Sequence, residues 1–207
     1  MKILLFIFFS IVLNASNYPL FTKKEIINIE KKSGHIAKNR VIDYINTIES
    51  FKKMPKQKQL LKVNMYLNQL LPQYDNIIQK KEDYWATPKE FLTIGYGDCE
   101  DYVIIKYFTL LKLGFDKNKL FLTTVNEAYT GGYHMVLSYF ESKNKPPLIL
   151  DNLSFRVLDL AKREDLKADL FINSNGVYQI DKEYKLRPVA KRFMQYDKLL
   201  QKIQKEN

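Results

Sequence analysis

The chain has 207 residues, of which 46% are hydrophobic and 14% aromatic, so one domain can bury a core without disulfides or metals. Its 33 Lys and Arg residues against 23 Asp and Glu give a formal net charge of +10, a balance that favours an anionic surface or an acidic partner. No zinc-finger spacing, RNP-like aromatic motif or local cluster of Arg with aromatics is present, which argues against nucleic-acid binding.

The first residues have the pattern of a short export signal. Lys2 precedes an apolar run at positions 3–13, and small residues follow it. This run is about half of the roughly 20 residues that a membrane-spanning helix needs. The pattern predicts a signal peptide over residues 1–16, cleaved near Ala15 or Ser16. Because Leu13 fits the small-residue rule poorly, an uncleaved membrane anchor is the alternative.

The stretch from residue 23 to residue 71 has the periodicity of helices. Its apolar residues recur at spacings of three and four, for example at Ile45 and Ile48. Pro55 and Pro72 interrupt the pattern, since proline disrupts helix interiors. The stretch therefore predicts two or three helices.

Two helices are expected next. Thr87 followed three residues later by Glu90, with Pro88 between them, is a capping-box signature that predicts a short helix. Residues 95–98 then predict a turn, and residues 99–113 a helix that Gly114 ends as a C-cap. Cys99 is thus expected in the first turn of a helix.

The second half of the chain changes to short alternating or apolar runs, which predict strands. These runs cover residues 120–125, 133–140, 147–150, 155–158 and 177–180. A basic helix or tail is expected from Lys191 onward. No internal repeat or low-complexity linker appears, so residues 17–207 are predicted to form a single domain.

Cys99 is the chain's single cysteine, so it has no disulfide partner within the chain. A helix N-terminus stabilises a thiolate, which is the nucleophilic form of cysteine, and its free N–H groups can hold an oxyanion. The position favours a catalytic nucleophile. The alternative is a buried cysteine that acts as a small hydrophobic residue.

Three acids surround this thiol, namely Asp98, Glu100 and Asp101. Their charges would raise the pKa of Cys99 by repulsion, so an imidazolium or a bound cation is needed to offset them. Clustered carboxylates suit calcium, which takes oxygen ligands. By spacing alone, the simpler interpretation is that these acids complement the helix dipole.

The chain offers two histidines as a base for the thiol. His35 lies in a polar stretch and is expected at the surface. His134 begins a predicted strand after Gly131-Gly132 and is the better candidate, although a histidine paired in the core is also possible. Asp151 ends an apolar strand, where a buried acid needs a partner such as His134, unless it lies in a solvated turn.

Several motifs in order resemble the bacterial transglutaminase-like cysteine proteinase family. They are Gly97-Asp98-Cys99-Glu100-Asp101-Tyr102, Lys106-Tyr107-Phe108-Thr109-Leu110, Leu113-Gly114, His134-Met135-Val136-Leu137 and Leu150-Asp151-Asn152, and Tyr84-Trp85-Ala86-Thr87-Pro88 resembles the stretch before the family's cysteine. The likeness covers roughly residues 30–185, and its Gly-Asp-Cys-Glu-Asp core is specific.

This resemblance implies an α+β, papain-like or transglutaminase-type fold, with N-terminal helices and the Cys helix packed on an antiparallel sheet. It implies a catalytic triad of Cys99, His134 and Asp151. It also implies calcium held by Asp98 and Glu100, with Asp101 as a further candidate, because a dication would invert the local field of these acids.

The resemblance also implies a periplasmic endopeptidase that cuts the N-terminal region of a large exported adhesin near paired alanines, releasing cells from a biofilm. An inner-membrane cyclic-di-GMP receptor is the implied regulatory partner. Two rivals remain open: a transglutaminase or amidase that uses the same triad, and a binding module without turnover.

Overall fold

The computed structural model describes residues 17–72, 84–129 and 131–206. Within these ranges the helices are α1 (Lys23–Phe51), α2 (Lys56–Leu67), α4 (Pro88–Ile94), α5 (Cys99–Lys112) and α6 (Met194–Glu206), with short 3-10 turns η2 (Lys117–Lys119) and η3 (Leu160–Lys162). The predicted signal peptide at residues 1–16 lies outside the described residues and stays a prediction.

The strands form one large antiparallel sheet and one small parallel pair. The large sheet contains β3 (Leu120–Glu127), β4 (Tyr133–Tyr139), β5 (Leu148–Asp151), β6 (Ser154–Asp159), β7 (Leu166–Asn173), β8 (Gly176–Ile180) and β9 (Leu186–Ala190), in the order β6-β5-β4-β3-β7-β8-β9. The parallel pair is β1 (Leu71–Pro72) with β2 (Tyr96–Gly97). This α+β architecture, with the Cys helix on an antiparallel sheet, confirms the expected fold class.

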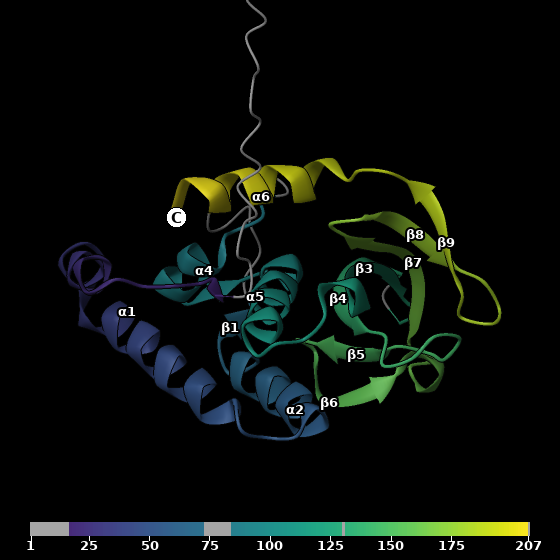
Figure 1. Cartoon of the computed structure of the whole chain (residues 1–207), viewed down its shortest axis with the longest axis horizontal. Helices are drawn as coiled ribbons and strands as arrows, with labels where there is room; N and C mark the ends of the chain where they lie inside the picture. The colour runs from purple at the N-terminus through teal and green to yellow at the C-terminus, as the bar shows by residue number, and fades with distance from the viewer. Residues whose placement is uncertain (1–16, 73–83, 130, 207) are drawn as a thin grey trace, which may run out of the picture.

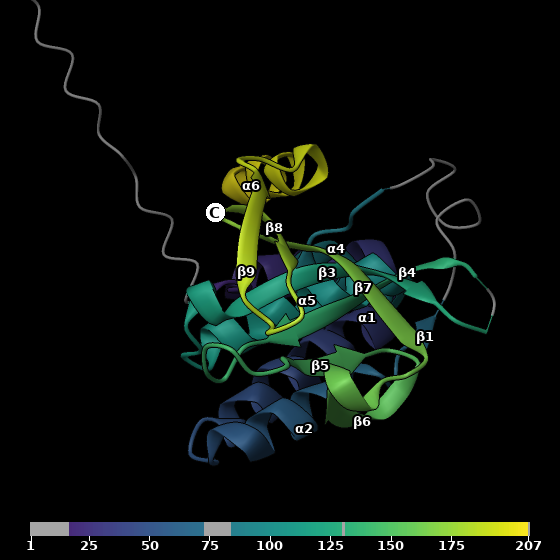
Figure 2. The ribbon, with the colours of Figure 1, turned by 90° about the vertical axis from the view of Figure 1, so that its right-hand side faces the viewer.

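Helix α5 is the element on which the two halves of the molecule meet. It packs against β3, β4 and β5 on one side and against α2 and α4 on the other. Figures 1 and 2 show α1, α2, α4 and α5 gathered beside the sheet, with α6 running across one end. Every residue of α5 from 101 to 111 is buried, as its nearly continuous apolar sequence requires.

Helix α1 contains a break that resolves whether two or three helices fill this region. Gly34 has φ 84° and ψ 173°, so two helical segments join there at an angle. The second segment buries Val41, Tyr44 and Ile48, which recur every three or four residues and face the core. The prediction of two or three helices is therefore confirmed.

Local signals place α4 where the sequence predicted it. The Thr87 side chain accepts from the backbone N–H of Glu90, and the Glu90 side chain accepts from the backbone N–H of Thr87. Gly95 ends the helix in the left-handed conformation with φ 91°. A short strand, β2, follows where the sequence predicted only a turn.

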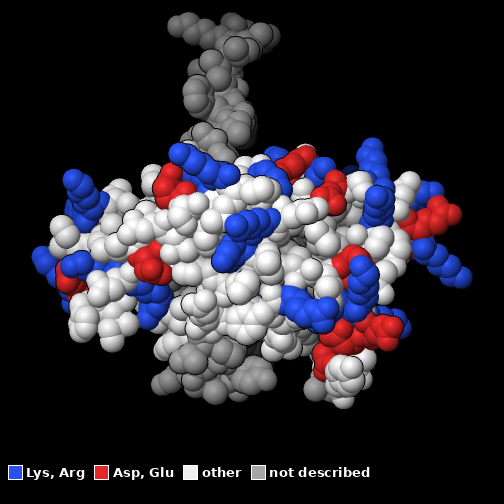
Figure 3. All heavy atoms as spheres, turned by 90° about the horizontal axis from the view of Figure 1, so that it is seen from below, with Lys and Arg blue, Asp and Glu red and all other residues white. Residues whose placement is uncertain are grey.

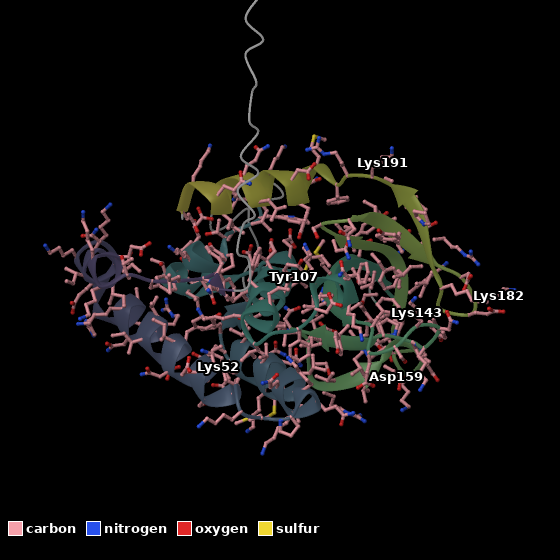
Figure 4. The ribbon with its side chains drawn as sticks, in the orientation of Figure 1. Lys52, Tyr107, Lys143, Asp159, Lys182 and Lys191 are labelled. Atoms are coloured by element: carbon pink, nitrogen blue, oxygen red, sulfur yellow. The ribbon has the colours of Figure 1, made fainter. Side chains whose placement is uncertain are left out.

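The C-terminal helix α6 ties together segments that are distant in sequence. The Glu206 carboxylate accepts hydrogen bonds from the Tyr18 hydroxyl and, at 2.6 Å, from the Thr87 hydroxyl. Further along α6, the Tyr196 hydroxyl lies 3.2 Å from that of Tyr107, which Figure 4 shows on the α5 side facing α6. The sequence left a helix or a tail open here, and the structure shows a helix.

The sequence patterns did not predict two of the strands, β7 and β9. Strand β7 carries Lys167 and Asp169 among its apolar residues, so its alternation is weak. Strand β9 is an edge strand, and Pro188 within it is a residue that sheets tolerate only at edges and bulges.

The basic side chains are dispersed over the molecular surface. On the face in Figure 3, Lys and Arg side chains lie scattered among uncharged residues and do not form one block. Among the described residues, no helix combines the length and apolar character needed to cross a bilayer.

Candidate active site

The turn that leads into α5 places Cys99 at the first position of this helix. Asp98 is the N-cap and has an extended backbone, with φ −94° and ψ −167°. The turn requires a glycine at position 97, because a Cβ there would lie 2.4 Å from Oδ2 of Asp101. The backbone N–H of Cys99 therefore belongs to the first helical turn, whose N–H groups have no partner within the helix.

The sulfur of Cys99 lies between a carboxylate and the start of β4. Its Sγ donates to Oε2 of Glu100 at 3.0 Å, and the backbone N–H of Met135 donates to the sulfur. Burial raises the pKa of the Cys99 thiol, the charges of Glu100 and Asp98 raise it further, and the Met135 N–H opposes them. Because Met135 follows His134 directly, the thiol lies beside the backbone of the predicted base.

His134 and Asp151 form a hydrogen-bonded pair. His134 Nε2 lies 2.8 Å from Asp151 Oδ1, and the two side chains are 9% and 0% exposed. The pairing of β4 with β5, in which Leu137 lies opposite Leu150, brings the ends of these strands together. The structure thus brings together the two residues that the sequence placed at strand ends.

Asp151 is held by more than the histidine. Its Oδ1 also accepts the N–H of Leu153 at 2.9 Å, and its Oδ2 accepts Nη2 of Arg163 at 2.7 Å. Burial alone would raise the pKa of Asp151, but the bonds from His134, Leu153 and Arg163 outweigh it and lower the pKa to about 2. The carboxylate is therefore ionised at any ordinary pH, even though it is buried.

Arg163 is a site residue that sequence reasoning missed. Its guanidinium contacts the carboxylate of Asp165 through Nε at 2.8 Å and through Nη2 at 2.6 Å, while Nη2 also reaches Asp151. Nothing in the sequence distinguishes it among the 33 Lys and Arg residues of the chain. Arg163 becomes part of the site because η3 brings it against the end of β5.

The second histidine takes no part in these contacts. His35 lies exposed on α1, directly after the break at Gly34, as the sequence predicted. His134 is therefore the histidine that adjoins the thiol.

The three acids beside Cys99 differ in what their side chains do. Asp98 stands at the N-cap, yet its carboxylate makes no capping hydrogen bond, and Glu100 lies against the sulfur. Oδ1 of Asp101, by contrast, accepts the backbone N–H of Ala86 at 2.8 Å, and the residue is 3% exposed. Asp101 thus helps to anchor the segment before α4.

The donor set beside the thiol suits calcium in part. Asp98 and Glu100 supply hard oxygen donors on either side of the thiol, which suits calcium, and their charges act unfavourably on a thiolate unless a cation offsets them. Among the described residues, no group of three or more His, Cys, Asp or Glu forms a metal site by itself. Two acids therefore fit the ion, with the remaining ligands to come from other oxygens or water.

The chain is similar to proteins of one known family. Residues 41–165, which include Cys99, His134, Asp151 and Arg163, match the family model of the bacterial transglutaminase-like cysteine proteinase. No curated protein matches the chain.

Solved structures also resemble the chain. A calcium-bound structure of LapG from Legionella pneumophila has a TM-score of 0.76 at 32% identity, covering 88% of this chain and 99% of that one. An EGTA-treated structure of the same protein has a TM-score of 0.76 at 34% identity, with 89% and 99% covered.

Proposed function

The chain belongs to the bacterial transglutaminase-like cysteine proteinase family, and from this premise we propose that it is a calcium-dependent periplasmic endopeptidase with Cys99, His134 and Asp151 as its triad. One observation carries the assignment. The sulfur of Cys99 lies against the backbone of the residue after His134, whose ring is bonded to a buried, ionised Asp151.

The proposed reaction is acyl transfer to water. His134 takes the proton of the Cys99 thiol, the resulting thiolate attacks the scissile carbonyl carbon, and the backbone N–H of Cys99 stabilises the oxyanion. The tetrahedral intermediate collapses as the C–N bond breaks and His134 protonates the leaving amine. His134 then takes a proton from water, the hydroxide attacks the thioester, and the carboxylic acid leaves with the thiol restored. Asp151 fixes the tautomer and direction of the ring throughout.

Calcium would be held by the carboxylates of Asp98 and Glu100. When bound, it would supply positive charge that offsets the two acids and so favours the thiolate. Asp101, the third acid that the resemblance implied, already uses Oδ1 to accept the Ala86 N–H, so we assign it mainly to the support of the turn. The calcium-bound form of LapG supports the choice of ion.

For the substrate, we propose the N-terminal region of a large exported adhesin, cleaved near paired alanines so that cells leave a biofilm. For the partner, we propose an inner-membrane cyclic-di-GMP receptor that sequesters the protease. Family membership and the likeness to LapG support this part of the proposal. The predicted signal peptide supports this proposal, because export would bring the enzyme to the adhesin and to the periplasmic side of the receptor.

Two assays test the proposal. The first incubates the protein and calcium with an N-terminal fragment of the nearest encoded giant adhesin. Two shorter products are expected, whereas a cross-linked or deamidated product would favour a transglutaminase or amidase.

The second assay measures the rate at which iodoacetamide alkylates Cys99, because an activated thiol reacts faster than an ordinary one. The rate should fall sharply in His134→Ala but not in the control His35→Ala. Equal rates in all three proteins would overturn the triad.

A further inference from the structure

Lys106 is a buried basic residue that the proposed mechanism does not use. It lies on α5 and is 0% exposed, and its Nζ donates no hydrogen bond to any described residue. Its Nζ lies 5.8 Å from the ring centroid of Tyr102, which is a weak contact for a cation. A buried ammonium is stable only when hydrogen bonds or opposite charge replace its hydration.

Buried oxygen acceptors that also lack a hydrogen-bond partner lie around the turn that follows Asp151. Asn64 Nδ2 donates to the Ser154 carbonyl at 2.7 Å, and Asn68 Nδ2 donates to the Asp151 carbonyl at 2.7 Å. These bonds fix both amides, so their oxygens face elsewhere. The Oδ1 atoms of Asn64, Asn68 and Asn152 are buried and accept no hydrogen bond from the described part of the chain.

The packing of α5 brings together the elements that carry these donors and acceptors. Lys106 lies seven residues after Cys99, two turns along the same face of α5. Helix α5 packs against both α2, which carries Asn64, and β5, which ends at Asp151. Burial lowers the pKa of Lys106 to about 7 and the charge of Asp151 opposes this, so the two groups lie within electrostatic reach.

We propose that Lys106 is a positioning residue for Asp151, acting through buried water that its Nζ shares with the amide oxygens of the turn. A buried water forms about three hydrogen bonds, and Nζ of Lys106 offers two N–H donors as an amine and three as an ammonium, so shared water satisfies both sets of groups in either form. The amides of Asn64 and Asn68 hold the backbone of the turn from α2, and Lys106 would hold it from α5. This inference rests on the proposed triad, because it concerns the residue that orients His134.

The test replaces Lys106 with methionine, which has a similar length and no donors. Lys106→Met should keep or raise the melting temperature, because it removes a buried charge, while the alkylation rate of Cys99 by iodoacetamide falls by about 10-fold or more. Lys106→Gln should recover part of the rate, since its amide can donate to water. Lys58→Met, at an exposed position of α2, should change neither quantity.

A proton NMR signal gives a readout that is independent of the cysteine. The ring N–H that bonds Asp151, identified by its loss in His134→Ala, should shift in Lys106→Met and partly return in Lys106→Gln. Unchanged alkylation and an unchanged N–H signal in Lys106→Met would overturn the proposal. If this variant fails to fold, Asn152→Ala provides the test, because it removes one of the acceptors and leaves the bonds of Asn64 and Asn68 to the turn intact.

The two proposals fail in different ways. A wild-type alkylation rate equal to that of His134→Ala would overturn the triad. The N–H signal would still decide whether Lys106 positions Asp151, because it reports on the bond between His134 and Asp151 alone.

Discussion

Arg163 and His134 bind different oxygens of the same carboxylate, that of Asp151, at 2.7 Å and 2.8 Å. With both oxygens occupied, the carboxylate cannot rotate without breaking a charge-assisted bond. The orientation of the ring therefore depends on an arginine that lies 12 residues beyond the acid.

Arg163→Met should make Cys99 less reactive, although Arg163 does not contact the thiol. Loss of the guanidinium leaves Oδ2 of Asp151 without its strongest donor, so we expect the alkylation rate of Cys99 to fall by about 10-fold to 100-fold. Arg163→Lys should recover only part of it, because lysine lacks the planar fork. The exposed pair of Arg187 with Asp181 supplies the control, Arg187→Met. A wild-type rate in Arg163→Met would refute this role.

The stability of the protein should fall in acid because of Asp151. Its pKa is about 2 when folded and about 3.9 when unfolded, so the unfolded state binds a proton first as the pH drops. This contribution, about 2 to 3 kcal/mol, is complete above about pH 5 and is lost as the pH falls through 4 towards 2. Urea unfolding of wild type and Asp151→Asn between pH 5 and pH 2 should show the steeper loss in wild type. Parallel curves would contradict the lowered pKa.

Lys106 should also make wild type less stable as the pH falls, but in the range between pH 10.5 and pH 7. Its pKa is about 7 when folded, so between pH 10.5 and pH 7 the unfolded chain holds a proton that the folded chain lacks. As the pH falls through this range, wild type should lose about 1.4 kcal/mol of unfolding free energy per pH unit relative to Lys106→Met. Urea titrations at pH 7, 8.5 and 10 measure this difference. A difference that does not change with pH would show that Lys106 is solvated as well as a surface lysine.

Removal of calcium should stop cleavage of the adhesin fragment. EGTA is expected to abolish product formation, and Asp98→Ala or Glu100→Ala should imitate it, with calcium binding measured by calorimetry. The exposed acid Glu164 supplies the control, Glu164→Ala. Asp101→Ala should instead lower the melting temperature, because the Ala86 N–H loses its acceptor. Full cleavage in EGTA would remove calcium from the mechanism.

Features that depend on neighbouring residues could be predicted from the sequence. The capping box of Thr87 and Glu90 places the start of α4, and a glycine turn followed by an apolar run places Cys99 at the tip of α5. His134 and Asp151 were also identified, because each lies at the end of an apolar strand. Their mutual contact required the strand register, which the sequence does not contain.

Features that depend on distant contacts could not be predicted. Arg163 acts only because η3 folds back on β5. Strand β7 carries charged residues inside the sheet, and β9 carries a proline at its edge, so neither has the alternation of a typical strand. Lys106 interrupts an apolar helix, a pattern that is typical of an exposed face. The structure buries it because α5 is covered by α2 on one side and by the sheet on the other.

The two hydrogen bonds that the Glu206 carboxylate accepts have a practical consequence for handling the protein. Its carboxylate joins Tyr18, near the predicted cleavage point, to Thr87, which caps the helix directly before the cysteine turn. Affinity tags or truncations that disturb α6 would therefore act on both ends of the folded chain together. Purified material intended for enzymology should keep its last helix native, or a loss of turnover will be mistaken for a defect in the chemistry.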